Sequence, residues 1–132
     1  MVADASARIG TKRYYVELQA GRHALAADEP AENGGADTGP APFGLLLSGL
    51  GACTAITLRM YADRKRWPLE GVDVQLAYTV KDRATRWIDQ QITLRGPLED
   101  DQRARLTEVA EKTPVTRAVR AGTETRTTIA RA

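Results

Sequence analysis

The chain has 132 residues and a mass of 14.4 kDa, the size of one domain, which we expect to span residues 1–132. Apolar residues make up 42% of it, so it can build a hydrophobic core and is not a disordered chain. Its 19 Lys and Arg stand against 17 Asp and Glu, and they are scattered from Arg8 to Arg131. We expect no nucleic-acid partner, because proteins that bind nucleic acids concentrate basic charge in a patch.

Metal and disulfide sites are limited by the presence of one cysteine, Cys53, and one histidine, His23. A Cys/His zinc site takes three or four such ligands and a disulfide takes two thiols, so a single chain can form neither. A hydrolase would have to use His23 as its base. No motif surrounds His23, which lies in a predicted strand. We expect no metal and no cofactor.

The N-terminal part predicts a short hairpin followed by a loop. Residues 1–10 combine neither a basic start nor an apolar stretch, so we expect no secretory signal and a cytoplasmic protein. Residues 13–28 contain two strand-like runs, YYVELQ and HALAAD, joined at Ala20-Gly21. The loop at residues 29–41, EPAENGGADTGPA, is about a dozen residues long, which is typical of a functional or interface loop.

A long helix is expected from Pro42 to Trp67, before Pro68. Between residues 45 and 62 only Arg59 is charged, so the helix is apolar nearly all round and should be buried on most sides. Such a stretch approaches the length of a membrane span. The Gly and Pro residues before it and the charges that follow Arg59 favour a core helix instead, with no membrane partner.

Alternating apolar residues predict a strand at residues 72–80, and a second strand is expected at 86–95. The charged turn KDRAT between them makes the pair antiparallel. Residues 98–112 place apolar side chains on one helical stripe, which predicts an amphipathic surface helix.

The C-terminal part predicts a short helix and a last strand. Thr113 has the character of an N-cap and Pro114 that of a first helical residue, in a helix that ends at Gly122. The tail TETRTTIAR alternates β-branched and charged residues, which predicts a final strand. The order of two strands, a long helix, two strands, two helices and a strand predicts an α+β fold.

Cys53 lies in the middle of the long helix, within GLGACTAIT. Composition alone favours a small buried hydrophobe, because unpaired cysteines are mostly buried. Gly49 and Gly51, however, each cost the helix about 1 kcal/mol relative to Ala. They indicate that another segment or a ligand packs closely against the backbone near Cys53.

Residues 39–76, GPAPFGLLLSGLGACTAITLRMYADRKRWPLEGVDVQL, resemble the OsmC/Ohr family of osmotically inducible and organic hydroperoxide resistance proteins. The runs HALAADEP and GPLEDDQRARLTEVAEKTPVTRAV extend the likeness to nearly the whole chain, from Tyr14 to Ile129. The resemblance implies an intertwined α+β homodimer. In it, two central helices carry the reactive cysteines between sheets built from both chains.

The resemblance also implies a reaction. A first cysteine attacks a hydroperoxide, a second resolves the sulfenic acid as a disulfide, and an arginine with a carboxylate holds the first as a thiolate. Cys53 matches the first cysteine. Thr113 stands at the second position, with Thr116 in the same motif. The carboxylate expected after Pro42 has no counterpart, and the loop at residues 29–41 holds no arginine.

These departures predict a weak one-cysteine peroxidase or none. An apolar site without a cationic partner predicts a raised pKa for Cys53, and its own chain offers no thiol to resolve a sulfenic acid. Arg59 lies about 120° round the helix from Cys53. A cation would have to come from Arg117 of the partner subunit or Arg120 of the partner subunit.

Three functions follow from these residues. The first is a thiol peroxidase in oxidative-stress defence, in which Cys53 reduces organic hydroperoxides and an external thiol regenerates it. The second is a non-catalytic binder of a small hydrophobic ligand in the dimer cleft, and the third is a different cofactor-independent enzyme that uses Thr113, Thr116 and Cys53. The side chains expected to line the cleft are Phe43, Leu46, Leu50, Thr57 and Met60.

Two further expectations concern structure. The apolar surface of the long helix exceeds what one small sheet can cover, so we expect an obligate homodimer. We expect Thr113 to act as an N-cap rather than a nucleophile, with its hydroxyl accepting a hydrogen bond from the N–H of residue 115 or 116.

Overall fold

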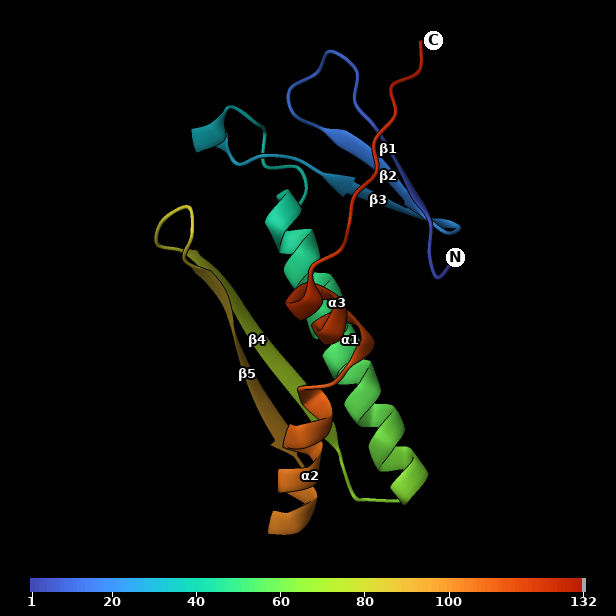
Figure 1. Cartoon of the computed structure of the whole chain (residues 1–132), viewed down its shortest axis with the longest axis vertical. Helices are drawn as coiled ribbons and strands as arrows, with labels where there is room; N and C mark the ends of the chain where they lie inside the picture. Colours follow the sequence, from blue (N-terminus) through green and yellow to red (C-terminus); the bar gives the residue numbers. More distant parts are fainter. Residues whose placement is uncertain (132) are drawn as a thin grey trace. The chain divides into compact units, whose positions relative to one another are not determined.

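The structure is a computed structural model that describes residues 1–131 (Figure 1). It is an α+β structure with antiparallel sheets and one long helix, as the sequence predicts. The chain divides into two compact units, one from residue 1 to 48 and the other from residue 49 onward. The long helix begins in the first unit and continues into the second.

A three-stranded antiparallel sheet forms the first unit, with β1 (Ala5–Arg8), β2 (Val16–Ala20) and β3 (His23–Ala27) in that order. The predicted hairpin is β2–β3, and Gly21 turns the chain with a φ of +57°. β1 was not expected, because ASAR has no apolar alternation. β1 forms because its backbone pairs with that of β2. The strand propensity of the β1 residues does not indicate this pairing.

The loop after β3 contains a short 3-10 helix, η1 (Ala31–Asn33), and is organised by Asp28. The Asp28 carboxylate is 2% exposed and accepts hydrogen bonds from the backbone N–H groups of Tyr14, Glu29 and Thr38, at 3.2, 2.7 and 3.1 Å. The hydroxyl of Thr38 donates a fourth, at 2.6 Å. A carboxylate with four donors ties both ends of this loop together.

The long helix α1 (Pro42–Lys65) ends slightly earlier than predicted. Arg66 takes a left-handed conformation with a φ of +59°, and Trp67 precedes a proline, which disfavours helical geometry. One face of the helix is buried, at Leu50, Gly51, Thr54, Leu58 and Ala62.

The other side of α1 is open in the single chain, so burial on most sides, which was expected together with a second copy, stays a prediction. Ile56 and Met60 are 53% and 59% exposed. The reason is the small number of elements that pack against α1. In the second unit these are a two-stranded hairpin and two short helices, and they cover one face (Figure 1).

The hairpin consists of β4 (Gly71–Val80) and β5 (Arg86–Arg95), as predicted, and is followed by α2 (Asp100–Ala110) and α3 (Pro114–Ala121). Leu76 of β4 lies against Gly51 of α1, where an added Cβ would come within 2.8 Å of it. The close approach that the sequence indicated therefore exists at Gly51. Nothing in the described chain lies within 4 Å of a Cβ at Gly49.

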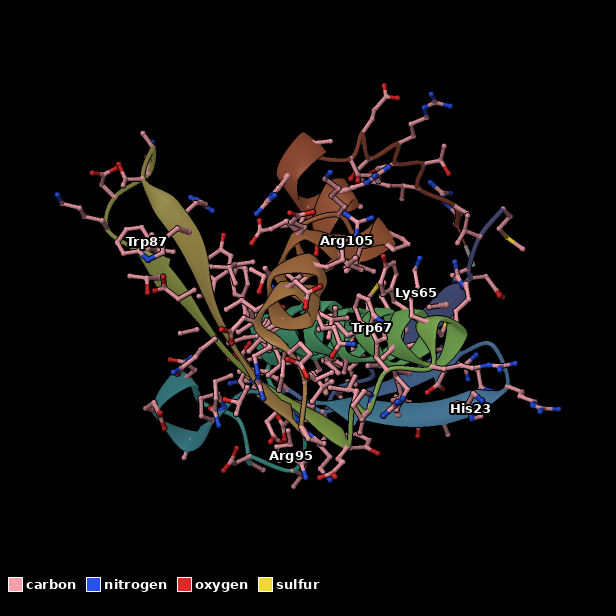
Figure 2. All side chains as sticks on the ribbon, turned by 90° about the horizontal axis from the view of Figure 1, so that it is seen from below. His23, Lys65, Trp67, Trp87, Arg95 and Arg105 are labelled. Carbon is pink, nitrogen blue, oxygen red and sulfur yellow. The ribbon has the colours of Figure 1, made fainter. Side chains whose placement is uncertain are left out.

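The hydrophobic core of the second unit joins α1, the turn before β4, and α2. Its buried members are Leu58, Ala62, Leu69, Leu98, Leu106 and Ala110. Beside it, Trp67, Lys65 and Arg105 gather round Tyr61 (Figure 2). The Arg105 Nε donates to the Tyr61 hydroxyl at 2.9 Å, which ties α2 to the end of α1.

The predicted C-terminal strand is wrong for the single chain. Residues 122–131 form no strand, and Ile129 is 96% exposed. Alternation of β-branched residues provides a propensity, but a strand also needs a neighbouring backbone to pair with, and no described segment pairs with this one.

Candidate functional site

Cys53 lies at the middle of α1, half-buried, and its thiol is free. Its Sγ is 3.9 Å from the Oγ1 of Thr57, one helical turn further on. Thr54, the next residue, is fully buried and donates a hydrogen bond to the Oε1 of Gln90 on β5 at 2.8 Å. The wall of the site on this side is therefore fixed by a bond between α1 and the hairpin.

The start of α3 meets the sulfur of Cys53. The backbone N–H of Val115 and the hydroxyl of Thr113 both lower the pKa of the Cys53 thiol. Amide N–H groups in the first turn of a helix have no partner within the helix, and they carry the positive end of its dipole. A thiolate at this place is stabilised by the same groups that stabilise reactive cysteines in other proteins.

Burial raises the pKa of the Cys53 thiol, whereas the Val115 N–H, the Thr113 hydroxyl and the Thr57 hydroxyl lower it. The hydrogen bonds outweigh burial, and the pKa lies below its ordinary value. The sequence-based expectation of a raised pKa is therefore wrong. It considered only charged partners, because the sequence does not show that the start of α3 reaches Cys53.

Thr113 is the N-cap of α3, as predicted. Its hydroxyl accepts a hydrogen bond from the Thr116 N–H at 3.2 Å, and its Oγ1 lies 2.7 Å from the Oγ1 of Thr116. Both side chains are buried, with 0% and 6% exposure. The same hydroxyl also contributes to the lowered pKa of Cys53.

A groove of about 540 Å³ opens beside these residues, between the β4–β5 hairpin and α3. Its walls combine apolar side chains with charged ones at the hairpin and near the end of α3, and Figure 2 shows Trp87 on the hairpin. The lining residues are Leu50, Tyr78, Arg86, Trp87, Ile88, Asp89, Gln90, Glu111, Thr116, Val119 and Arg120.

Three of the charged groups of the groove have partners within its walls. Arg120 forms an ion pair with Glu111, and the Asp89 carboxylate accepts a hydrogen bond from the Trp87 Nε1 at 3.0 Å. Arg86 donates to the backbone carbonyl of Arg83 at 3.2 Å. Because two cations and two anions line the groove, their formal charges balance, and the groove suits a neutral ligand with an apolar body.

The residues expected at the site are only partly brought together. Leu50 lines the groove and Thr57 contacts Cys53, whereas Phe43, Leu46 and Met60 are exposed on α1. Their place in a cleft between two copies stays a prediction. Val115 and Gln90 were not expected at the site, although the Thr-Pro pair that starts α3 was a usable signal for the Val115 N–H.

Arg59 and Arg120 are both bonded to groups other than Cys53. Arg59 bonds to Asp63 and to the backbone carbonyl of Leu69, away from Cys53. Arg120 is held by Glu111. Within residues 1–131 no group of three His, Cys, Asp or Glu could hold a metal ion.

Helix α1 is long and apolar enough to cross a membrane, by length and composition alone. Core helices of other proteins satisfy the same criteria. Here one face of the helix packs on Leu76 and Gln90 of the hairpin, and Arg105 of α2 bonds to Tyr61 of the helix.

Residues 34–128 match the family model described as OsmC-like protein. A similar fold occurs in the OsmC-like protein from Mycoplasma pneumoniae, with 16% identity, a TM-score of 0.72, and coverage of 91% of this chain and 88% of that one. Another is the organic hydroperoxide resistance protein OsmC from Legionella pneumophila, with 21% identity, a TM-score of 0.66, and coverage of 91% of this chain and 90% of that one. A third is the organic hydroperoxide resistance protein OhrB of Bacillus subtilis, with 22% identity, a TM-score of 0.62, and coverage of 91% of each chain. No curated protein sequence matches the chain. The family model covers well over half of the sequence, and the chain belongs to the OsmC-like family.

Proposed function

We propose that the protein is a one-cysteine, thiol-dependent peroxidase that reduces organic hydroperoxides in oxidative-stress defence. The observation that carries the proposal is the lowered pKa of the Cys53 thiol, to which Val115 and Thr113 at the start of α3 contribute, beside a groove that combines apolar and charged side chains. Two structures of the same fold are named for organic hydroperoxide resistance, which supports the substrate class. We place this activity in the cytoplasm.

The reaction takes two stages. The Cys53 thiolate attacks the terminal oxygen of R–O–O–H, so that the O–O bond breaks, Cys53 becomes a sulfenic acid, and the alkoxide takes a proton from water to leave as R–OH. A small external thiol then forms a mixed disulfide with Cys53 and releases water. A second molecule of this thiol attacks the mixed disulfide, which frees Cys53 and yields the external disulfide.

We also propose that the working form is a homodimer. Leu46, Gly49, Cys53, Ile56 and Met60 follow one another at spacings of three and four residues, which places them on one stripe of α1. Exposed apolar side chains of this stripe flank the reactive cysteine. A second copy of α1 would cover these side chains and that of Phe43, and it would exclude water from the site.

The test is consumption of cumene hydroperoxide with dithiothreitol as the external thiol. Wild-type protein should consume the peroxide catalytically, and Cys53→Ser should lose this activity while keeping its circular dichroism spectrum. Thr107→Val, on the exposed side of α2, serves as a control that keeps the activity. Equal rates for wild-type protein and Cys53→Ser would rule out the proposed function.

A binder of neutral apolar ligands is the second candidate, and the groove with two cations and two anions is the observation that favours it. This function does not need the sulfur. The test is the binding of a hydrophobic fluorescent probe. Binding that is unchanged in Cys53→Ser and lost in Trp87→Ala would support the binder, if the wild-type protein also has no peroxidase activity.

A further inference from the structure

Gln90 of β5 lies at the boundary between two cavities of the second unit. It lines the groove of about 540 Å³ and also a smaller cavity of about 190 Å³, and Glu111 is the other residue that lines both. The remaining walls of the smaller cavity are mostly aliphatic, and they are formed by Leu58, Ile92, Leu94, Leu106, Thr107 and Ala110. The Gln90 side chain is therefore a polar group with open space on two sides.

The hydroxyl of Thr54 fixes the orientation of the Gln90 carboxamide. Thr54 is 0% exposed, and its hydroxyl donates to the Oε1 of Gln90 at 2.8 Å. A carboxamide carries two N–H donors on its nitrogen besides the oxygen acceptor. Within this planar group the nitrogen lies on the other side of Cδ from the oxygen. Because the oxygen faces Thr54, the Nε2 of Gln90 faces away from it.

The Nε2 of Gln90 is a donor in search of an acceptor. Within the described residues, the Gln90 side chain makes its hydrogen bond to Thr54 through oxygen, and neither N–H group has an acceptor. No fully buried side-chain nitrogen or oxygen among residues 1–131 lacks a partner, so the Nε2 is not sealed in the core and can be reached from the cavities. A few polar groups placed in this way orient ligands in largely apolar sites.

The charges around Gln90 favour a ligand that carries no charge. Glu111 forms an ion pair with Arg120, and the Asp89 carboxylate accepts a hydrogen bond from the Trp87 Nε1 at 3.0 Å. The guanidinium of Arg86 donates to a backbone carbonyl at 3.2 Å. The cost of removing an ion from water falls on a charged ligand, and a neutral one avoids it.

We propose that Gln90 is a ligand-binding residue, whose Nε2 donates a hydrogen bond to an acceptor oxygen of a neutral small molecule with an apolar body. The apolar part of the groove, at Leu50, Ile88 and Val119, takes the body of the ligand. The inference rests on the proposed function only in that an organic hydroperoxide is one molecule of this class.

Two probes that differ in one acceptor test the inference. Acetophenone and ethylbenzene share a phenyl ring with a two-carbon side chain, but acetophenone alone has a carbonyl oxygen. Two-dimensional NMR titrations of isotope-labelled protein give the dissociation constant of each probe, and both should shift the amide signals of residues 86–90. The readout is the ratio of the two constants, because a general change of the groove affects both probes alike.

Gln90→Leu removes the donor and keeps a side chain of similar size. It should weaken the binding of acetophenone about two- to tenfold and leave that of ethylbenzene near the wild-type value. The matched control is Gln91→Leu, which replaces the next glutamine on the exposed side of β5 and should keep the ratio of the wild type.

Gln90→Leu also leaves the buried Thr54 hydroxyl without its acceptor, which destabilises the fold. The double variant Thr54→Val with Gln90→Leu removes both partners and should change the ratio equally. Circular dichroism establishes that each variant is folded. If neither leucine variant folds, Gln90→Glu decides the question, because its carboxylate keeps an acceptor for Thr54 and has no N–H donor.

Three results would overturn the inference. They are wild-type titrations that shift no amide signal of residues 86–90, an unchanged ratio in a folded variant without the Gln90 donor, and an equal change of the ratio in Gln91→Leu. Neither probe has an O–O bond. A protein without peroxidase activity that shows the expected change in Gln90→Leu would therefore contradict the proposed function alone, and an active peroxidase with an unchanged ratio would contradict the assignment of Gln90 alone.

Discussion

At the scale of the residue, Cys53 shows how the pKa of a thiol can be lowered by groups that carry no charge. Hydrogen bonds from Val115, Thr113 and Thr57 together outweigh the effect of burial on its pKa. A donor to a charged acceptor contributes more than a neutral hydrogen bond, about 1.5–3 kcal/mol. Two or three such donors can therefore offset the loss of hydration at a half-buried sulfur.

The contact between Thr113 and Cys53 predicts the result of introducing a second thiol. Thr113→Cys places a thiol where a hydroxyl now lowers the pKa of Cys53, and a disulfide forms only where the two Cα atoms lie about 4.4–6.8 Å apart. Mild oxidation with diamide should link the two cysteines, with loss of both free thiols on titration and a cross-linked peptide in mass spectrometry. Val119→Cys, one turn beyond Thr116 on α3, should link less readily.

If the Thr113→Cys variant keeps both thiols under these conditions, the contact between the start of α3 and Cys53 is wrong. Peroxidase turnover of the variant should exceed that of the wild type where resolution by the external thiol limits the rate, because the new thiol then attacks the sulfenic acid within the chain.

At the scale of the element, Asp28 organises the loop between β3 and α1. The hydroxyl and backbone N–H of Thr38, with the N–H groups of Glu29 and Tyr14, hold the pKa of Asp28 well below its usual range. A carboxyl group whose pKa is lower in the folded state than in the unfolded chain stabilises the fold above its unfolded pKa, near 4, and this contribution is lost as pH falls below it.

Asp28→Asn should therefore lower the melting temperature at pH 7, because the amide replaces an acceptor with a donor that faces backbone N–H groups. The difference from the wild type should shrink as pH falls below about 4, since the carboxyl then becomes protonated in the unfolded wild-type chain, which favours unfolding. Asp37→Asn in the same loop is the control, because asparagine readily adopts its φ of 55°. A constant difference between pH 7 and pH 2 would contradict this account.

At the scale of the whole molecule, the open stripe of α1 predicts association. Ile56→Glu places a carboxylate on the stripe, where a second copy would have to bury it at a cost of several kcal/mol. The wild type should sediment as a dimer and Ile56→Glu as a folded monomer of 14.4 kDa. Ala104→Glu, on the exposed side of α2, should leave the dimer unchanged.

A wild-type protein that sediments as a monomer at micromolar concentration would contradict the dimer. The presence of a second copy also bears on the C-terminal tail, residues 122–131. Its alternation of β-branched residues predicts a strand, and residues 122–131 have no partner strand in the described chain.

Local patterns in the sequence determined most elements of the protein. Alternation predicted β4 and β5, since one face of each strand is apolar, and Thr113, Pro114 and Gly122 marked the ends of α3 by their backbone preferences. The resemblance around Cys53 identified the family, which the match over residues 34–128 confirms.

Tertiary structure decided what depends on contacts between distant segments. β1 forms only because β2 lies beside it, and the tail forms no strand in the described chain because no backbone lies beside it. The pKa of Cys53 falls because Val115, 62 positions along the chain, brings its N–H to the sulfur. Propensity and periodicity describe a few neighbouring residues, whereas strand pairing and thiolate stabilisation depend on donors and acceptors that only folding brings together.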